Sequence, residues 1–377
     1  QIVYIKKKGI LESSPKGILQ FLVKGYFKLF FFSRKEKYDI IQFFFSVPTG
    51  LLKFSLKKNI PYICSLRGMD VPSDERNNKF SKMIRKIEFL NKKVVDVKPS
   101  GIRKFFSIAE EMDDVISLGV GEPDFLTPWH IRQTGIKYLE KGATRYTANA
   151  GLIELRREIA NFFSRKYKVD YDYKSEIMVT VGGSEGIDMC IRSLISAGDE
   201  VLVVEPSFVC YRPIVETCGG VAVPLVTKNE NNFKLTAEDL EAAITDKTKL
   251  LVLPYPNNPT GAVMRKDDLV AIARIIKKHN LLVLSDEIYA ELTYGDQNHI
   301  SIASISDMKE RTIVINGFSK TYSMTGWRLG YAVGPKPIIE QMTKLHQFAI
   351  MSAPTNSQWA AIDALRNGDE DIERMIT

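Results

Sequence analysis

Short apolar runs that alternate with amphipathic helical segments are the feature that most limits how this chain can fold. Beyond about Arg85, the runs are four to six residues long, and each ends in a polar or glycine-containing turn. Strands that are buried on both faces give continuous apolar runs, and intervening helices are the crossovers that parallel strands require. The pattern therefore predicts an α/β fold in which a mostly parallel central sheet has helices on both faces. Five of these runs precede chemically informative residues: 177–181, 201–204, 250–253, 281–284 and 312–315.

The basic charge of the chain is confined to its N-terminal part. Residues 1–85 hold 17 Lys and Arg against 6 Asp and Glu, a net charge of +11, whereas the remaining residues hold 35 against 39, which is −4. Residues 74–85 are polar and charge-rich without strand alternation, which is typical of a linker. We therefore expect two regions of different character, residues 1–85 and residues 86–377.

Cysteine and histidine spacing favours a cytoplasmic protein without a metal centre. The four cysteines include no CxxC pair, which is typical of reduced thiols. The four histidines are scattered singly, so no two of them share a helix face as metal ligands often do. We expect no nucleic-acid partner. The most apolar stretch, residues 18–32, is too short to span a bilayer and carries a polar stripe.

Residues 1–80 have a short α/β pattern of their own. Its expected elements are a helix over 18–32, a strand over 40–45, a helix over 49–57 and a strand over 62–66. Strand, helix and strand with turn residues between them predict a piece of parallel sheet. Through SVPTG at 46–50 and SLRGMDVP at 65–72, the segment resembles part of the N-terminal domain of a GT-B glycosyltransferase. The other half of such an enzyme is absent, so no activity is assigned to this segment.

Two of the loops that follow apolar runs carry ionisable residues, and such loops are where open α/β sheets bind ligands. Asp286 resembles the metal-holding acid of a P-loop NTPase, but the chain has no GxxxxGK[ST] string to pair with it. We interpret it instead as a carboxylate that faces a cationic ring nitrogen, with Tyr289 one helical turn further along. Lys320 follows a buried run and a glycine, where partial desolvation would make its amine lose a proton readily, as a Schiff-base lysine must.

The three remaining loops carry weaker signals. Gly183 and Ser184 open a helix whose backbone N–H groups and hydroxyl could form an anion cup, although very many helices begin this way. Phe208 could stack on a flat ligand or belong to the core. Asn258 lies in a loop fixed by prolines and a glycine, where its amide could donate to a ligand oxygen or simply form a turn.

One ligand accounts for all five loops. Pyridoxal phosphate requires an amine for its aldimine, an anion opposite its pyridinium nitrogen and a phosphate cup with a guanidinium. It also requires a stacking ring and donors to its phenolic oxygen. The sequence therefore indicates a pyridoxal-phosphate enzyme.

From about Phe89 onward, the chain resembles the class I/II aminotransferases, which are pyridoxal-phosphate enzymes of fold type I in the aspartate aminotransferase superfamily. The three most specific matching strings are NNPTG, SDEIY and SKTYSMTGWR. The full set is SGIRKF at 100–105, GVGEPDF at 119–125, YTANAG at 146–151, NNPTG at 257–261, SDEIY at 285–289 and SKTYSMTGWR at 319–328.

That resemblance implies a role for each matching residue. Lys320 would form the internal aldimine, Asp286 would face the pyridinium nitrogen, and Asn258 and Tyr289 would bind the phenolic oxygen. Phe208 would stack on the ring. The phosphate would be held by Gly183, Ser184, Ser319 and Arg328, and by Tyr146 of the neighbouring subunit, which implies a homodimer with shared active sites. Gly121 would lie in the loop that closes over the substrate carboxylate.

The implied reaction is transfer of an amino group between an L-amino acid and a 2-oxo acid, with glutamate and 2-oxoglutarate as one pair. The same residues serve relatives that act as C–S β-lyases, and the motifs do not separate the two. A third alternative is a non-catalytic fusion or fragment in which the basic residues 1–85 form a membrane-surface module.

The chain departs from the family pattern at both ends. It begins with the unrelated N-terminal segment, and it stops at Thr377, before the C-terminal part of the small domain. In the family, that part supplies the arginine that holds the substrate α-carboxylate. We therefore expect residues 86–377 to form an aminotransferase domain with a partial small domain.

Overall fold

A computed structural model describes residues 41–43, 62–64, 91–97, 121–295 and 298–377. The chain divides into two compact units, Gln1–Asp96 and Val97–Thr377. The boundary predicted near Arg85 lies outside the described residues. So do the predicted helices at 18–32 and 49–57 and the strings that resemble a glycosyltransferase.

The first unit contains two short strands and a helix among its described residues. The strands are β1 (Ile41–Phe43) and β2 (Tyr62–Cys64), and they pair in parallel. Their pairing confirms that the two predicted runs belong to a parallel sheet, while the likeness to a glycosyltransferase stays a prediction. The helix is α4 (Lys92–Asp96). Within the described parts of the chain, no helix combines the length and the apolar character needed to cross a bilayer.

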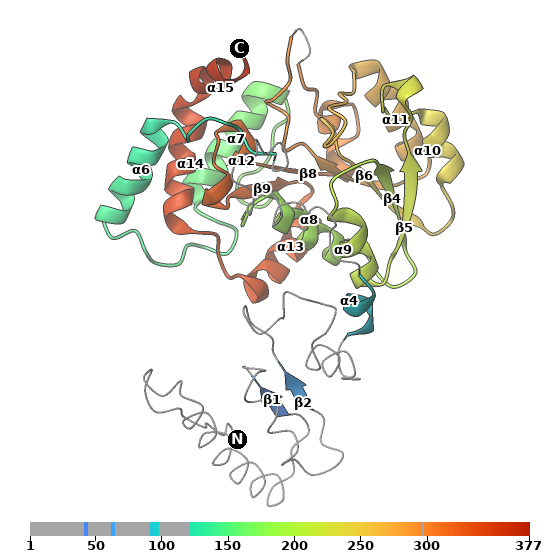
Figure 1. Cartoon of the computed structure of the whole chain (residues 1–377), viewed down its shortest axis with the longest axis horizontal. Helices are drawn as coiled ribbons and strands as arrows, with labels where there is room; N and C mark the ends of the chain where they lie inside the picture. Colours follow the sequence, from blue (N-terminus) through green and yellow to red (C-terminus); the bar gives the residue numbers. More distant parts are fainter. Residues whose placement is uncertain (1–40, 44–61, 65–90, 98–120, 296–297) are drawn as a thin grey trace, which may run out of the picture. The chain divides into compact units, whose positions relative to one another are not determined.

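A seven-stranded sheet forms the centre of the second unit (Figure 1). Its order is β3-β9-β8-β7-β6-β4-β5, and β9 alone runs antiparallel to both of its neighbours in this sheet. The prediction of a mostly parallel α/β sheet is confirmed. The strands are β3 (Ile177–Thr180), β4 (Glu200–Glu205), β5 (Val221–Val226), β6 (Thr248–Leu253), β7 (Leu282–Asp286), β8 (Thr312–Gly317) and β9 (Gly330–Val333).

The topology brings the predicted loops together at one edge of this sheet. Strands β4, β6, β7 and β8 are parallel, so their carboxyl ends share that edge. Strand β3 is antiparallel to β9, and β9 is antiparallel to β8, so β3 also ends there. Five loops that are far apart in the sequence therefore border the same space, as expected for a ligand site in an open sheet.

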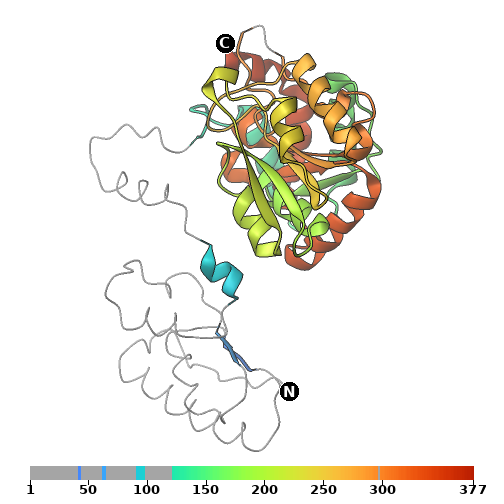
Figure 2. The same ribbon diagram turned by 90° about the vertical axis from the view of Figure 1, so that its right-hand side faces the viewer.

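Alternating side chains place the strands between two apolar cores. On β6, Leu250 and Val252 belong to the core beneath α8, α9 and α13, whereas Leu251 and Leu253 belong to the core beneath α10 and α11. Successive side chains of a strand point to opposite faces, so both faces of this sheet need a helical cover. Figures 1 and 2 show helices on both faces. These helices are α8 (Gly183–Leu194), α9 (Tyr211–Cys218), α10 (Ala237–Ala243), α11 (Lys266–Lys278) and α13 (Lys336–Ala349).

A third apolar core lies where β3, β8 and β9 meet the remaining helices. Within it, the Tyr331 ring packs edge to face against both Phe163 and Phe318. The helices of this region are α6 (Trp129–Glu140), α7 (Ile153–Tyr167), α12 (Phe318–Thr321), α14 (Thr355–Asn367) and α15 (Asp369–Ile376). The described residues of the second unit also include four short 3₁₀ helices: η3 (Asn229–Asn231), η4 (Ile302–Ser304), η5 (Lys309–Arg311) and η6 (Thr325–Trp327).

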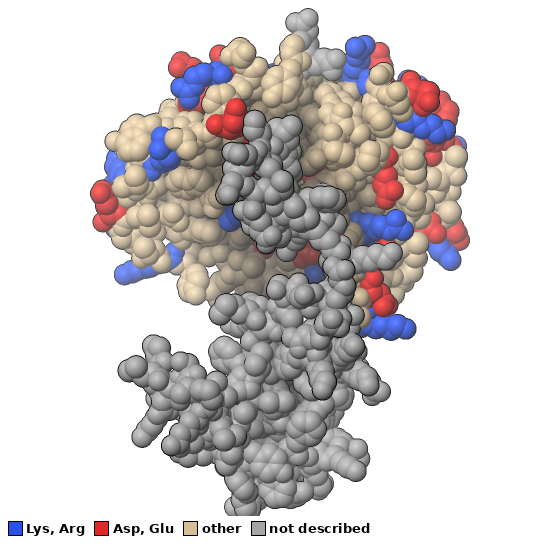
Figure 3. Space-filling model, in the orientation of Figure 1, with Lys and Arg blue, Asp and Glu red and all other residues tan. Residues whose placement is uncertain are grey.

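The described surface of the second unit mixes acidic and basic side chains. Figure 3 shows Lys and Arg interspersed with Asp and Glu on the visible face. Several of these groups pair with one another, as Arg192 does with Asp188 and Lys249 with Asp199. Such a mixed surface agrees with the near-neutral charge of residues 86–377.

Candidate active site

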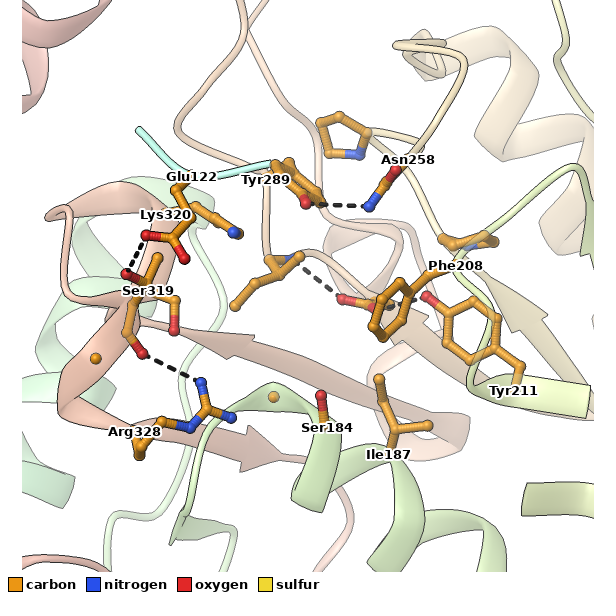
Figure 4. A pocket seen from close by; sticks show the side chains of 17 residues that line it. Glu122, Ser184, Ile187, Phe208, Tyr211, Asn258, Tyr289, Ser319, Lys320 and Arg328 are labelled. Atoms are coloured by element: carbon orange, nitrogen blue, oxygen red, sulfur yellow. Dashed lines mark hydrogen bonds between the residues drawn. The ribbon is translucent and has the colours of Figure 1, made fainter. Parts of the chain in front are cut away.

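A cavity of about 420 Å³ opens at the sheet edge where the five loops meet. Most of the residues proposed from the sequence line it: Gly183, Ser184, Phe208, Asn258, Asp286, Tyr289, Ser319, Lys320 and Arg328. Figure 4 shows that Tyr289 and Asn258 lie on one side of the cavity and that Ser184 and Arg328 lie on the opposite side. The structure thus brings together side chains that are separated by up to 145 positions in the sequence, from Gly183 to Arg328.

Lys320 is held at the cavity by a short helix that starts directly after β8. Its Nζ donates a hydrogen bond to the carbonyl oxygen of Gly121 and lies 5.9 Å from the centre of the Tyr289 ring. Burial lowers the pKa of the Lys320 ammonium, and the positive charge of Arg328 lowers it further, whereas Glu122 raises it. The site therefore favours the neutral amine, which is the nucleophilic form.

Asp286 ends β7 and is only 6% exposed. Its carboxylate accepts a hydrogen bond from the Tyr211 hydroxyl at 2.5 Å and one from the backbone N–H of Ile288 at 3.2 Å. Burial raises the pKa of Asp286 to about 6, and the charge of Glu287 acts in the same direction, while the two hydrogen bonds oppose the shift. A buried carboxylate of this kind is well suited to a cationic partner.

Asn258 and Tyr289 form a hydrogen bond with each other on one side of the cavity. The Asn258 Nδ2 donates to the Tyr289 hydroxyl at 3.2 Å. Burial raises the pKa of Tyr289, and the charge of Asp286 raises it further. The neighbouring Asn257 fixes the loop, because its side chain accepts from Thr260 and donates to the Pro206 carbonyl. Asn258 is thus presented by a braced loop, and Tyr289, from the segment after β7, lies beside it on the same side of the cavity.

The opposite side of the cavity has the features of an anion site. Helix α8 begins after Gly182, which has a φ of 77° and provides no side-chain cap. A Cβ at Gly182 would lie 2.8 Å from Arg328 Nη2, so only glycine allows this guanidinium to approach so closely. Arg328 itself has a φ of 53°, and its Nη1 donates to the Thr325 carbonyl at 3.2 Å. Uncapped helix N–H groups beside a guanidinium are suited to a phosphate.

Two predicted residues lie outside the cavity wall. Gly121 does not line the cavity, but its carbonyl oxygen accepts a hydrogen bond from Lys320. Tyr146 is 81% exposed, so it does not contribute to the site of its own chain.

Sequence reasoning missed two residues of the site. Tyr211, which binds Asp286, lies at the first position of α9, three residues after Phe208. The available signal was a second aromatic residue close after Phe208, whose ring Tyr211 contacts edge to face. Glu122 accepts from the Thr325 hydroxyl at 3.1 Å and lines the cavity, but it was quoted only as part of a matching string.

Comparison with known proteins extends over most of the second unit. A family model described as aminotransferase class I and II matches residues 113–377. A putative aminotransferase, YugH, from Bacillus subtilis is 50% identical over 287 residues, which are 76% of this chain and 74% of that protein. A probable N-acetyl-LL-diaminopimelate aminotransferase from the same organism is 45% identical over 75% of this chain and 71% of its own length.

Solved structures lead to the same family. The aspartate aminotransferase from Thermus thermophilus with maleate has a TM-score of 0.73 and 37% identity, with 76% of each chain covered. An aromatic aminotransferase from Pyrococcus horikoshii has a TM-score of 0.68 and 42% identity over 73% of this chain and 74% of that one. This chain therefore belongs to the class I and II aminotransferases, the fold-type I family of pyridoxal-phosphate-dependent transaminases.

Proposed function

We propose that the chain moves an amino group between an L-amino acid and a 2-oxo acid, with glutamate and 2-oxoglutarate as one pair, and that Lys320 is its catalytic amine. The observation that supports this most strongly is that two ionisable groups with shifted pKa values line the same cavity. Lys320 has a lowered pKa, and Asp286 is a buried carboxylate with a raised one. An amine and an acid prepared in this way are what the family's cofactor needs at its two reactive ends.

The residues of the cavity fit pyridoxal phosphate. When bound, the cofactor supplies a carbonyl carbon that bonds reversibly to amines and a ring that withdraws electrons. Asp286 would hold the ring nitrogen, Phe208 would lie against the ring, and Asn258 with Tyr289 would donate to the phenolic oxygen. The phosphate would be held by the start of α8 and by the side chains at the closed side of the cavity: Ser184, Ser319 and Arg328.

Lys320 would act twice in this scheme. Its Nζ would be the nucleophile toward the cofactor carbonyl, and the same Nζ would accept the proton from the substrate Cα. The half-buried position lowers the pKa of this amine and so favours the uncharged form that both roles require. Gly121 would close over the substrate carboxylate, and its carbonyl already orients the Lys320 side chain.

Asp286 would keep a proton on the cofactor ring nitrogen. Its pKa of about 6 reflects the free-energy cost of burying a charge without a cationic partner. A protonated ring nitrogen would supply that partner and lower the pKa of Asp286 again. Tyr211 would orient the carboxylate toward the ring through its 2.5 Å hydrogen bond.

A homodimer with shared active sites is part of the proposal. Tyr146 and Phe348 are 81% and 83% exposed, and Met351 is partly exposed beside them. The loop that carries Tyr146 is tied to this apolar segment, since Asn149 donates to the Met351 carbonyl and Thr355 to the Arg145 carbonyl. Apolar side chains exposed on a braced surface favour burial against a second copy.

Hydride trapping tests the proposed amine directly. The purified chain, loaded with pyridoxal phosphate and reduced with borohydride, should carry the label on Lys320 when its peptides are mapped by mass spectrometry. Lys320→Ala should abolish the adduct. Lys309→Ala is the matched control, because Lys309 also lies near the sheet but pairs with Glu176 outside the cavity. A label on another residue, or none, would overturn the proposal.

Steady-state assays separate amino transfer from β-elimination. Donor amino acids are offered with 2-oxoglutarate, and glutamate formation is measured alongside pyruvate and ammonia release from cystathionine. Glutamate formation that needs the oxo acid supports the aminotransferase. Pyruvate and ammonia without an oxo acid would identify a C–S β-lyase.

Mixed dimers test the shared site. In the proposed dimer, each site uses Lys320 of one subunit and Tyr146 of the other. Tyr146→Phe and Lys320→Ala therefore alter both sites of their own homodimer, so each variant alone should be impaired. A co-expressed mixture should regain activity, since one site of each mixed dimer would receive an intact Tyr146 and an intact Lys320. A mixture no more active than the average of the two variants contradicts the shared site.

A further inference from the structure

A buried histidine lies behind the start of α8, outside the cavity wall. His346, on α13, is 0% exposed, and its Nδ1 is 2.7 Å from Oε1 of Glu185 on α8. An ionised carboxylate only accepts hydrogen bonds, so Nδ1 is assigned as the donor. Its Nε2 has no partner among the described residues. The single polar contact found for this buried ring is therefore the one to Glu185.

Glu185 connects this histidine to the turn that opens the helix. Its other oxygen, Oε2, accepts from the backbone N–H of Val181 at 2.5 Å. Glu185 is the third residue of α8, and a carboxylate at that position commonly reaches back to the backbone before the helix. The turn is also closed by the Thr180 hydroxyl, which donates to the Gly182 carbonyl at 2.9 Å. Hydrogen bonds thus hold the turn at both Val181 and Gly182.

The position of this carboxylate matters for anion binding. A negative charge at a helix N-terminus takes up the same N–H groups that a phosphate would use, and it repels a second anion. The hydrogen bond from His346 holds Glu185 at the interface between α8 and α13, where its side chain is only 9% exposed. Gly182 has no side chain to cap the helix, so the first N–H groups of α8 stay available.

We propose that His346, acting through Glu185, positions the turn at residues 181–184 to receive the phosphate of the cofactor. His346 is a positioning residue, because neither it nor its partner Glu185 lines the cavity. The inference rests on the proposed function, since it assumes that the start of α8 binds the cofactor phosphate. It assigns a role to a histidine that lies 161 positions from its partner in the sequence.

Comparing the affinities for two ligands, one with a phosphate and one without, tests whether His346 positions the turn for phosphate binding. Pyridoxal phosphate and pyridoxal differ only in the phosphate, and binding of each is followed by absorbance titration of the cofactor-free protein. His346→Leu fills the space without a donor, and we expect it to weaken pyridoxal phosphate about tenfold, the effect of losing one hydrogen bond to a charged group. Pyridoxal affinity should stay within about twofold, because the turn contributes nothing to that ligand.

Two further variants make the comparison specific. His346→Asn keeps an N–H donor near the position of Nδ1 and should restore most of the phosphate preference. His279→Leu is the matched control, because His279 Nε2 makes a comparable 2.8 Å contact with Glu241 far from the cavity wall. It should change neither affinity.

Folding is checked by circular dichroism and thermal unfolding. If His346→Leu does not fold, His346→Met, which also lacks a donor, replaces it, and the same selective loss of phosphate preference is expected. A folded variant that loses affinity for both ligands equally, or for neither, would overturn the positioning role. Wild-type protein that binds pyridoxal phosphate without labelling Lys320 would instead overturn the catalytic proposal and leave this comparison intact. Wild-type protein that binds neither ligand would overturn both.

Discussion

The two ends of the cavity carry ionisable groups of opposite charge, an acid and an amine. Burial shifts the pKa of both groups. At one end Asp286 is almost completely buried, and burial raises its pKa to about 6. At the other end Lys320 is half-buried, and burial lowers its pKa. Both groups are thereby moved toward their neutral forms. The carboxylate end is braced by Tyr211, whereas the amine end is held mainly through a backbone carbonyl. The Asp286 carboxyl is thus placed to bind a cationic group, and the Lys320 amine is placed to react with a carbonyl carbon.

The largest expected effect lies at the amine end. Lys320→Ala removes the group that we propose as both nucleophile and proton carrier, so kcat for amino transfer should fall by about 10³-fold or more. Cofactor binding should persist, because the anion site and Asp286 are unchanged. Steady-state kinetics with and without added methylamine measure the effect, and partial rescue by the free amine is expected. A kcat within tenfold of wild type would contradict the catalytic role.

The next effect lies at the carboxylate end. Asp286→Asn removes the negative charge that would hold a proton on the ring nitrogen, and we expect kcat/KM to fall by about 10²-fold. Asp199→Asn is a suitable control, since Asp199 forms a surface ion pair with Lys249 away from the cavity. If Asp286→Asn lowered kcat/KM no more than Asp199→Asn does, the proposed role of the Asp286 charge would be wrong.

The pH dependence of stability tests the burial of Asp286 without any cofactor. Its folded pKa of about 6 lies above its ordinary value of 3.8, so its stabilising contribution is complete below pH 3.8 and is lost as the pH rises through about 6. The loss amounts to about 3 kcal/mol at most. Urea unfolding of cofactor-free protein at several pH values should show Asp286→Asn gaining stability relative to wild type between pH 4 and pH 7. Parallel curves for the two proteins would refute the raised pKa.

Tyr211→Phe should give the smallest effect of the series. It removes a hydrogen bond that lowers the pKa of Asp286, so that pKa should rise above about 6. The affinity of the cofactor-free protein for pyridoxal phosphate should then fall by about tenfold at pH 6 and by less at pH 8, where the carboxyl is ionised in either protein. Absorbance titration over this pH range measures the shift. A pH dependence identical to that of wild type would mean that Tyr211 only fills space.

Much of the fold and the cavity could be predicted because their signals are local. An apolar run followed by a polar residue marks the end of a buried strand, and parallel strands end at one edge, so Asp286 and Lys320 were placed together correctly. Tyr211 was missed because it belongs to a helix, where an aromatic residue usually belongs to the core. The contact between His346 and Glu185 could not be predicted, since nothing in either local sequence indicates how α8 packs on α13.

The antiparallel strand β9 has a consequence for how this site could change over evolutionary time. A Cβ at Gly330 would lie 2.6 Å from the Gly182 carbonyl carbon, and one at Gly317 would lie 2.9 Å from the Gly330 Cα. Three separate stretches of main chain therefore touch with no space for even one methyl group. Arg328, two residues before this crossing, owes its location to backbone spacing. Because larger side chains at Gly317 or Gly330 would have to displace main chain, we expect substitutions at this crossing to be poorly tolerated.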